Sequence, residues 1–208
     1  MKFELTDVDT EIVLMGRSNG GKSTIMREIT GKDFDTGRRP GVTRKPNQYD
    51  WSAESFAVTD MPGYGYMEGV EDERNDEIRD GIVEYLERRR EKILLAVHVV
   101  DAKSFVDVVD RWLERDELPY DMDIHGFLNE LGIPTVVAVN KIDKIDVDDR
   151  DERLNQIADR LGYLSPWRQW RDVFATTDAK SRNVEDLMQL IRQRLKEEKR
   201  HDLLKFFT

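Results

Sequence analysis

The sequence predicts an α/β fold in which helices cover both faces of a mostly parallel central sheet. Residues 11–15 are a short apolar run that leads into a glycine-rich turn and then into a helical pattern over residues 22–30. Residues 93–101 and 134–139 are continuous apolar runs, which is typical of strands buried on both faces of a sheet. Helical patterns separate these runs, and strands that alternate with helices build a parallel sheet.

The remaining elements are read from the period of the apolar residues and from glycine and proline punctuation. In chain order they are the strands 47–52 and 55–59, the helices 76–92, 103–113, 124–131 and 148–161, the strand 172–175 and the helix 184–199. The stretch 116–123 contains Pro119 and is expected to interrupt the acidic, insert-like segment 103–131. No repeat or low-complexity linker divides the chain, so one domain over residues 1–208 is expected.

Composition excludes several classes of function. The chain has no cysteine, which rules out disulfides, thiolate metal sites and cysteine nucleophiles. Its net charge of −10 argues against a wholly basic nucleic-acid-binding surface. No apolar run reaches the length of a membrane span and no signal peptide is visible, so a cytoplasmic protein without a membrane partner is expected. His98, His125 and His201 form no ligand pattern and are interpreted as structural or surface residues.

Residues 16–23 read Gly-Arg-Ser-Asn-Gly-Gly-Lys-Ser and fit the phosphate-binding P-loop pattern. The strand before the loop and the helix after it would aim backbone N–H groups and the positive end of a helix dipole at an anion. Lys22 would bridge the terminal phosphates of a nucleotide, and the Ser23 hydroxyl would bind Mg²⁺. The alternative, a glycine-rich turn that precedes Lys-Ser by chance, does not explain this strand–turn–helix context.

Two further candidate Mg²⁺ ligands are Thr43, which lies before the strand 47–52, and Asp60, which comes directly after the strand 55–59. Asp60-Met61-Pro62-Gly63 places a carboxylate after an apolar run, where it could hold a Mg²⁺-bound water, and the Gly63 N–H could sense a γ-phosphate. Thr43, in the loop before residue 47, would complete the Mg²⁺ shell. Each motif alone would be an ordinary turn or loop, and their order after the P-loop favours the functional interpretation.

Asn140-Lys141-Ile142-Asp143 follows a buried strand and is interpreted as a guanine reader. The Asp143 carboxylate can accept hydrogen bonds from both N1–H and the exocyclic amine of guanine, a donor pair that adenine lacks. Asn140 would tie loops together, and the Lys141 stem would pack over the base. The alternative is a polar turn at the start of a helix. Residues 177–180, Thr-Asp-Ala-Lys, resemble the Ser-Ala-Lys loop that touches the guanine carbonyl.

The order of these motifs matches the GTPase superfamily across nearly the whole chain. Residues 60–66, Asp-Met-Pro-Gly-Tyr-Gly-Tyr, resemble the Asp-x-Pro-Gly-Tyr-Gly-Tyr/Phe run of the EngB family, as do residues 16–19 and 83–86. The resemblance implies a Ras-like P-loop GTPase domain, relatedness to Era, and a link to assembly of the large ribosomal subunit and to cell division and septation. The sequence departs from the family at Val42, where many bacterial members have arginine, and in the length of segment 103–131.

The motifs and the resemblance together give a set of expected site residues. The expected catalytic residues are Lys22, Thr43, Gly63 and Asn19, and the expected Mg²⁺ ligands are Ser23, Thr43 and Asp60. The expected GTP contacts are Gly16, Arg17, Ser18, Asn19, Gly20, Gly21, Lys22, Ser23, Thr24, Gly41, Val42, Thr43, Arg44, Lys45, Asp60, Met61, Pro62, Gly63, Asn140, Lys141, Ile142, Asp143, Thr176, Thr177, Asp178, Ala179 and Lys180.

The sequence is therefore interpreted as a Mg²⁺-dependent GTP-binding protein that hydrolyses GTP slowly and switches between GTP- and GDP-bound conformations. Tyr64 stands where many GTPases place a water-orienting glutamine, and a phenol cannot position water in the same way. Asn19 resembles the asparagine of potassium-activated relatives, which adds K⁺ as a second cofactor. The alternative is that Asn19 braces the turn through a side-chain-to-backbone bond.

The expected partners are GTP, GDP and the large ribosomal subunit or its precursor, bound by a monomer. Arg38, Arg39, Arg44 and Lys45, with residues 88–90, could meet RNA phosphates, although a solvated surface explains them equally well. Two other functions are considered. An ATP-using P-loop kinase is disfavoured by the Asn-Lys-x-Asp motif, and a nucleotide-gated scaffold with incidental hydrolysis stays open.

Overall fold

The computed structural model describes residues 3, 5–31, 45–63, 72–178 and 183–207. The strands are β1 (Thr10–Met15), β2 (Asn47–Trp51), β3 (Phe56–Asp60), β4 (Ile93–Asp101), β5 (Thr135–Asn140) and β6 (Phe174–Thr176). The helices are α1 (Lys22–Thr30), α2 (Asp72–Arg89), α3 (Phe105–Leu113), α4 (Tyr120–Glu130), α5 (Arg150–Arg160) and α6 (Glu185–Glu197).

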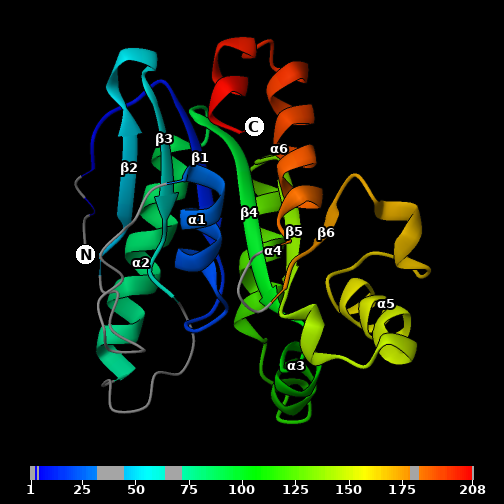
Figure 1. Cartoon of the computed structure of the whole chain (residues 1–208). Coiled ribbons are helices and arrows are strands. Elements are labelled where there is room, and N and C mark those ends of the chain that lie inside the picture. The colour runs from blue at the N-terminus through cyan, green and yellow to red at the C-terminus, as the bar shows by residue number, and fades with distance from the viewer. Residues whose placement is uncertain (1–2, 4, 32–44, 64–71, 179–182, 208) are drawn as a thin grey trace.

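One sheet with the strand order β2-β3-β1-β4-β5-β6 forms the centre of the molecule (Figure 1). Among the strands of the described residues, only β2 runs antiparallel to its neighbour, because it is joined to β3 by a tight connection over Ser52–Glu54. The other neighbouring pairs are parallel. The carboxyl ends of β1, β3, β4 and β5 therefore lie at one edge of the sheet, which confirms the mostly parallel α/β prediction.

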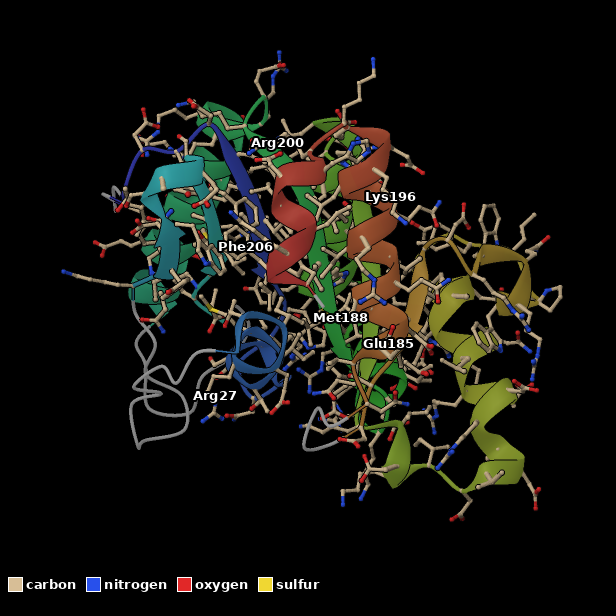
Figure 2. All side chains as sticks on the ribbon, turned by 45° about the horizontal axis from the view of Figure 1, so that its top comes forward. Arg27, Glu185, Met188, Lys196, Arg200 and Phe206 are labelled. Atoms are coloured by element: carbon tan, nitrogen blue, oxygen red, sulfur yellow. The ribbon has the colours of Figure 1, made fainter. Side chains whose placement is uncertain are left out.

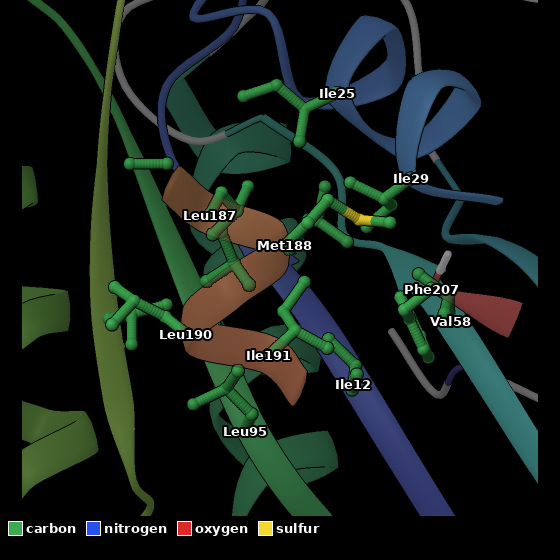
Figure 3. Close-up of a cluster of buried hydrophobic side chains, with 14 of the residues drawn as sticks. Ile12, Ile25, Ile29, Val58, Leu95, Leu187, Met188, Leu190, Ile191 and Phe207 are labelled. Atoms are coloured by element: carbon green, nitrogen blue, oxygen red, sulfur yellow. The ribbon is translucent and has the colours of Figure 1, made fainter. Parts of the chain in front are cut away.

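Helices α1 and α6 cover one face of the sheet. In Figure 3, side chains of both helices meet Ile12 of β1, Val58 of β3 and Leu95 of β4. Ile191 of α6 is completely buried in this cluster, which also contains Phe207 near the end of the chain. Burial of such apolar side chains contributes roughly 25 cal/mol for each Å² removed from water. This face is therefore a continuous hydrophobic layer that fixes α1 against the strand that precedes it.

Helices α2, α4, α3 and α5 cover the other face. α2 and α4 pack on β1 and β4 through a cluster that includes Ile82 and Leu128. α3 and α5 pack on β5 and β6 through a second cluster that includes Val109 and Ile157. Arg160 on α5 also makes a two-pronged ion pair with Asp110 on α3, at 2.6 and 2.7 Å. This pair and the apolar cluster hold α3 to α5.

A buried ion pair fixes α2 to the central strand. Glu11 of β1 is completely buried, and its Oε2 accepts a hydrogen bond of 2.9 Å from the Arg89 Nε. Its Oε1 accepts from the Tyr85 hydroxyl at 2.6 Å and from the Thr59 hydroxyl of β3. Because a buried carboxylate is stable only when it is paired, Glu11 holds β1, β3 and α2 in one arrangement.

The structure differs from the expected elements in several places. α2 spans Asp72–Arg89 rather than residues 76–92. α4 begins at Tyr120 rather than at residue 124. Pro119, with φ −65° and ψ 133°, is the residue just before the helix, where its missing N–H costs no helical hydrogen bond. A 3₁₀ helix over His201–Phe206 follows α6 and was not expected. Figure 2 labels Arg200, just before this turn, and Phe206, at its end; the ring centres of Phe206 and of Trp51 on β2 lie 4.6 Å apart.

None of the helices in the described part of the chain combines the length and the apolar character that a membrane span needs.

Candidate nucleotide-binding site

The predicted motifs meet at the carboxyl edge of the sheet. The P-loop follows β1, Asp60 ends β3, and Asn140 ends β5. The register places Leu14 beside Asp60 and Asp101 beside Asn140, so residues far apart in sequence lie at the same level. In open α/β sheets, ligands bind at this edge.

Lys22 lies inside the P-loop rather than in solvent. Its side chain is 6% exposed, and its ammonium donates hydrogen bonds to the carbonyls of Gly16 at 2.8 Å and Arg17 at 3.0 Å. Burial lowers the pKa of Lys22, and the carboxylates of Asp60 and Asp121 oppose that change. α1 begins at Lys22 with no acidic residue in its first turn. Its first N–H groups and the ammonium therefore present positive charge to an anion.

Two glycines of the site allow close approach of backbone segments. Gly21 has φ +103°, and a Cβ there would lie 2.1 Å from the Asn140 Nδ2. A Cβ on Gly63 would lie 2.6 Å from both the N and the Cα of Ser18. Any larger residue at either position would push the P-loop away from the loops that face it.

Ser23 and Asp60 form a hydrogen-bonded pair beside Lys22. The Ser23 hydroxyl donates a hydrogen bond to the Asp60 Oδ2. Asp60 is 1% exposed, and its other oxygen, Oδ1, has no hydrogen-bond partner among the residues that the structure describes. Burial raises the pKa of Asp60, while the Lys22 charge and the Ser23 hydrogen bond lower it. A hydroxyl and a buried carboxylate oxygen left without a partner are donors that fit Mg²⁺.

Asn140 joins three loops with one buried side chain. Its Nδ2 donates to the Gly20 carbonyl at 2.9 Å, and its Oδ1 accepts from the Lys141 N–H and the Thr177 hydroxyl, both at 2.8 Å. The Ile142 N–H also donates to the Thr177 carbonyl at 3.1 Å. The P-loop, the Asn-Lys-x-Asp loop and the loop after β6 are thus tied together. Asp143 lies at the exposed surface of this assembly, next to Lys144.

Lys141 extends from the Asn-Lys-x-Asp loop to the P-loop. Its ammonium donates to the Asn19 carbonyl at 2.8 Å and to the Asp101 Oδ2 at 2.6 Å. Asp101 was not among the residues expected from the sequence. The one signal in the sequence was its place as the last residue of a buried strand, where ligand-facing side chains gather.

The structure places the other expected residues as follows. Met61 and Ile142 are buried in the two clusters on the α2 and α3 face, so their side chains anchor the loops that carry Asp60 and Asp143. Lys45 is exposed, and Thr176 ends β6. Gly41, Val42, Thr43, Arg44, Ala179 and Lys180 lie outside the described residues, as does Tyr64.

A buried polar cluster lies on the α4 side of Lys22. His98 of β4 and His125 of α4 face each other with 3.3 Å between their Nδ1 atoms, and the His125 Nε2 lies 3.0 Å from the Tyr163 hydroxyl. The His98 Nε2 lies 3.6 Å from the Asp121 Oδ1. Burial, followed by the neighbouring His98, lowers the pKa of His125 to about 3. Both histidines are buried, and their contact was not predicted.

The chain is similar to known GTP-binding proteins in both sequence and fold. Residues 11–141 match the family described as 50S ribosome-binding GTPase. The probable GTP-binding protein EngB of Halorubrum lacusprofundi is 53% identical over 202 residues, which is 97% of each chain. A crystal structure of a probable GTP-binding protein engB has a TM-score of 0.80 and 40% identity, and the match covers 90% of this chain and all of that one. NFeoB from S. thermophilus, bound to GDP, AlF₄⁻ and K⁺, shares the fold at a TM-score of 0.55 and 24% identity, over 89% of this chain and 60% of that one.

Proposed function

The chain belongs to the EngB family of GTP-binding proteins, and we propose that it is a Mg²⁺-dependent switch in assembly of the large ribosomal subunit. Membership of the family makes it a GTPase. The observation that carries the proposal is the meeting of Lys22, Asp60 and Asn140 at one sheet edge, where they line the ends of β1, β3 and β5.

Mg²⁺ would be held by Ser23 and Asp60, with Thr43 added in the GTP-bound state. The unpartnered Oδ1 of buried Asp60 supports this assignment. When bound, the metal would neutralise negative charge on the phosphates. Lys22 would exchange its two carbonyl acceptors in the P-loop for phosphate oxygens, which is a small movement of an ammonium that is already in place. The first N–H groups of α1 would complete the phosphate cradle.

Guanine would be read by Asp143 while Asn140 and Lys141 hold the loop in position. The three hydrogen bonds of the Asn140 side chain support this division of roles, because they tie it to the P-loop, to Lys141 and to Thr177. Asp143 is exposed on the loop that Asn140 anchors. A paired acceptor there favours guanine over adenine.

Hydrolysis would be slow, and K⁺ would accelerate it through Asn19. The side chain of Asn19 is exposed and makes no hydrogen bond within the part of the chain that the structure describes, while Lys141 holds its carbonyl. Its amide oxygen is therefore available to a cation between the P-loop and the phosphates. Such a cation would stabilise the charge that an arginine finger stabilises in other GTPases. Tyr64, at the position after Gly63, gives no substitute for a water-orienting glutamine.

The large ribosomal subunit or its precursor is the proposed partner, met by a cytoplasmic monomer that cycles between GTP and GDP. The description of the matching family supports this choice. Exposed cations within the described residues include Lys45, Arg88 and Arg90, which suit contacts to RNA phosphates.

Single-turnover hydrolysis, with and without purified large ribosomal subunits, tests the proposal. We expect slow hydrolysis by the protein alone and acceleration or tighter GTP binding when subunits are added. A scaffold with incidental hydrolysis would bind subunits in the GTP state at an unchanged hydrolysis rate. If the protein bound no ribosomal subunits in either the GTP or the GDP state, and subunits did not change its hydrolysis rate, the switch would be contradicted.

A further inference from the structure

The carboxylate of Asp101 holds Lys141 in place above the P-loop. Its Oδ2 lies 2.6 Å from the Lys141 ammonium, which also donates to the Asn19 carbonyl at 2.8 Å. The Asp101 and Lys141 side chains are only 20% and 26% exposed, so solvent screens this pair incompletely. Charge-assisted hydrogen bonds of this length are stronger than neutral ones. The side chain of Lys141 therefore extends from the Asn-Lys-x-Asp loop to the P-loop.

The second oxygen of the same carboxylate binds the backbone just before α3. The Asp101 Oδ1 accepts hydrogen bonds from the N–H groups of Lys103 at 2.9 Å and Ser104 at 3.3 Å. The Ala102 N–H donates to the Asn140 carbonyl at 2.8 Å. Asp101 therefore joins the base-reading loop, the P-loop and the first turn of the acidic segment 103–131 at one point.

We propose that Asp101 is a positioning residue for the guanine base, and that it slows the release of both GDP and GTP by fixing Lys141. This inference rests on the proposed guanine site. Lys141 has φ +62°, a conformation that non-glycine residues rarely adopt. The two acceptors of its ammonium fix the direction of its stem, and a stem fixed before the base arrives loses less freedom on binding. The base is common to GDP and GTP, so both should be affected equally.

The decisive variant is Asp101→Asn, measured by the release rate of fluorescent GDP and GTP analogues. The amide keeps one oxygen for the start of α3 and replaces the acceptor of Lys141 with an N–H donor. We expect release of both nucleotides to become about tenfold faster, which corresponds to loss of one charge-assisted hydrogen bond. The rate of the hydrolysis step, measured in a single turnover, should not change, because the Asp101 carboxylate contacts Lys141 and the backbone of Lys103 and Ser104 rather than a reacting atom.

Matched variants separate this role from a general structural one. Asp107→Asn removes an exposed carboxylate from α3, the helix that follows Asp101, and should release nucleotide at the wild-type rate. In a Lys141→Ala background, Asp101→Asn should add no further effect, because Asp101 acts through Lys141. Asp101→Ser keeps an acceptor for α3 but is too short to reach Lys141, so it should repeat the Asn result even if the Asn variant folds poorly.

Wild-type release rates in both Asp101 variants would overturn the proposal and leave the guanine site intact. A full Asp101→Asn effect in the Lys141→Ala background would also overturn it. Failure of the wild-type protein to bind guanine nucleotide would instead contradict the proposed function, and the positioning role with it.

Discussion

Asn140 illustrates how one side chain organises the site. Its residue type and its place in Asn-Lys-x-Asp were visible in the sequence, and so was an expected role in joining loops. Its three partners, Gly20, Lys141 and Thr177, depend on folding that brings residues 120 positions apart into contact. Because the amide is completely buried, each lost hydrogen bond would leave a polar atom without water to replace it.

Asp143→Asn should weaken GTP binding and raise the relative affinity for xanthosine triphosphate. The carboxylate offers two acceptors to N1–H and N2–H, whereas an amide offers one acceptor and one donor. The mismatch should cost on the order of 1–3 kcal/mol. Titration with fluorescent GTP and competition by xanthosine triphosphate measure it, with Asp146→Asn on the same exposed loop as the control. Unchanged GTP affinity in the Asp143 variant would remove this residue from the site.

Asn19→Ala should abolish activation by K⁺ while leaving GDP binding intact. The substitution removes the exposed amide oxygen and keeps the Asn19 carbonyl that Lys141 holds. The measurement is the steady-state rate of GTP hydrolysis in KCl and in NaCl at equal ionic strength, for the wild type and for Asn19→Ala. If the wild type ignores the cation, activation must come from a partner.

At the scale of elements, the bounds predicted from the sequence match the structure best where a local sequence signal, such as a glycine that ends a helix, is strong. α1 has the expected bounds because Gly31, with φ +63°, ends it with a backbone hydrogen bond to the Arg27 carbonyl. The start of α4 was placed too late because Pro119 was interpreted only as a helix breaker. The turn over His201–Phe206 has no 3.6-residue pattern, and its packing on Trp51 is a long-range contact.

The C-terminal turn should contribute directly to stability. Phe207 is completely buried in the α1 and α6 cluster, so Phe207→Ala should lower the free energy of unfolding by about 3–5 kcal/mol. Urea unfolding measures this change, and Leu164→Ala, at a residue 76% exposed, serves as the control. A loss below about 1 kcal/mol would show that the turn is not part of the core.

On the scale of the whole molecule, buried ionisable groups link the sheet to its helices. Glu11 ties α2 to β1 and β3, and the contact of His98 with His125 ties α4 to β4. Neither cluster was predicted, because a lone glutamate and two histidines 27 residues apart carry no motif. The role of Asp101 was not predicted either, because Asp101 belongs to no motif. Motif residues could be predicted because their spacing is fixed within one loop, whereas their supporting partners come from other elements.

The His125 environment should make the protein less stable in acid. The pKa of His125 is about 3 when folded, against about 6.5 when unfolded, so the unfolded chain binds more protons between these values. Stability should therefore fall as the pH drops from about 6.5 toward 3, by up to about 1.4 kcal/mol per pH unit from this group. Urea unfolding of His125→Gln at pH 7, 6 and 5 should show a shallower decline.

His201→Gln, at an exposed histidine, is the matched control and should follow the wild-type pH profile. An unchanged slope in the His125 variant would mean that His125 does not control the acid sensitivity.

Competition between nucleotides for the wild-type protein tests the central claim most directly. Fluorescent GDP would be bound in the presence of Mg²⁺ and displaced by unlabelled GDP, GTP or ATP. The geometry of Lys22, Asp60 and Asn140, with Asp143 as the base reader, predicts displacement by GDP and GTP and none by a large excess of ATP. It also predicts weaker GTP binding when Mg²⁺ is removed. Displacement by ATP as effective as that by GTP would contradict a guanine-specific site.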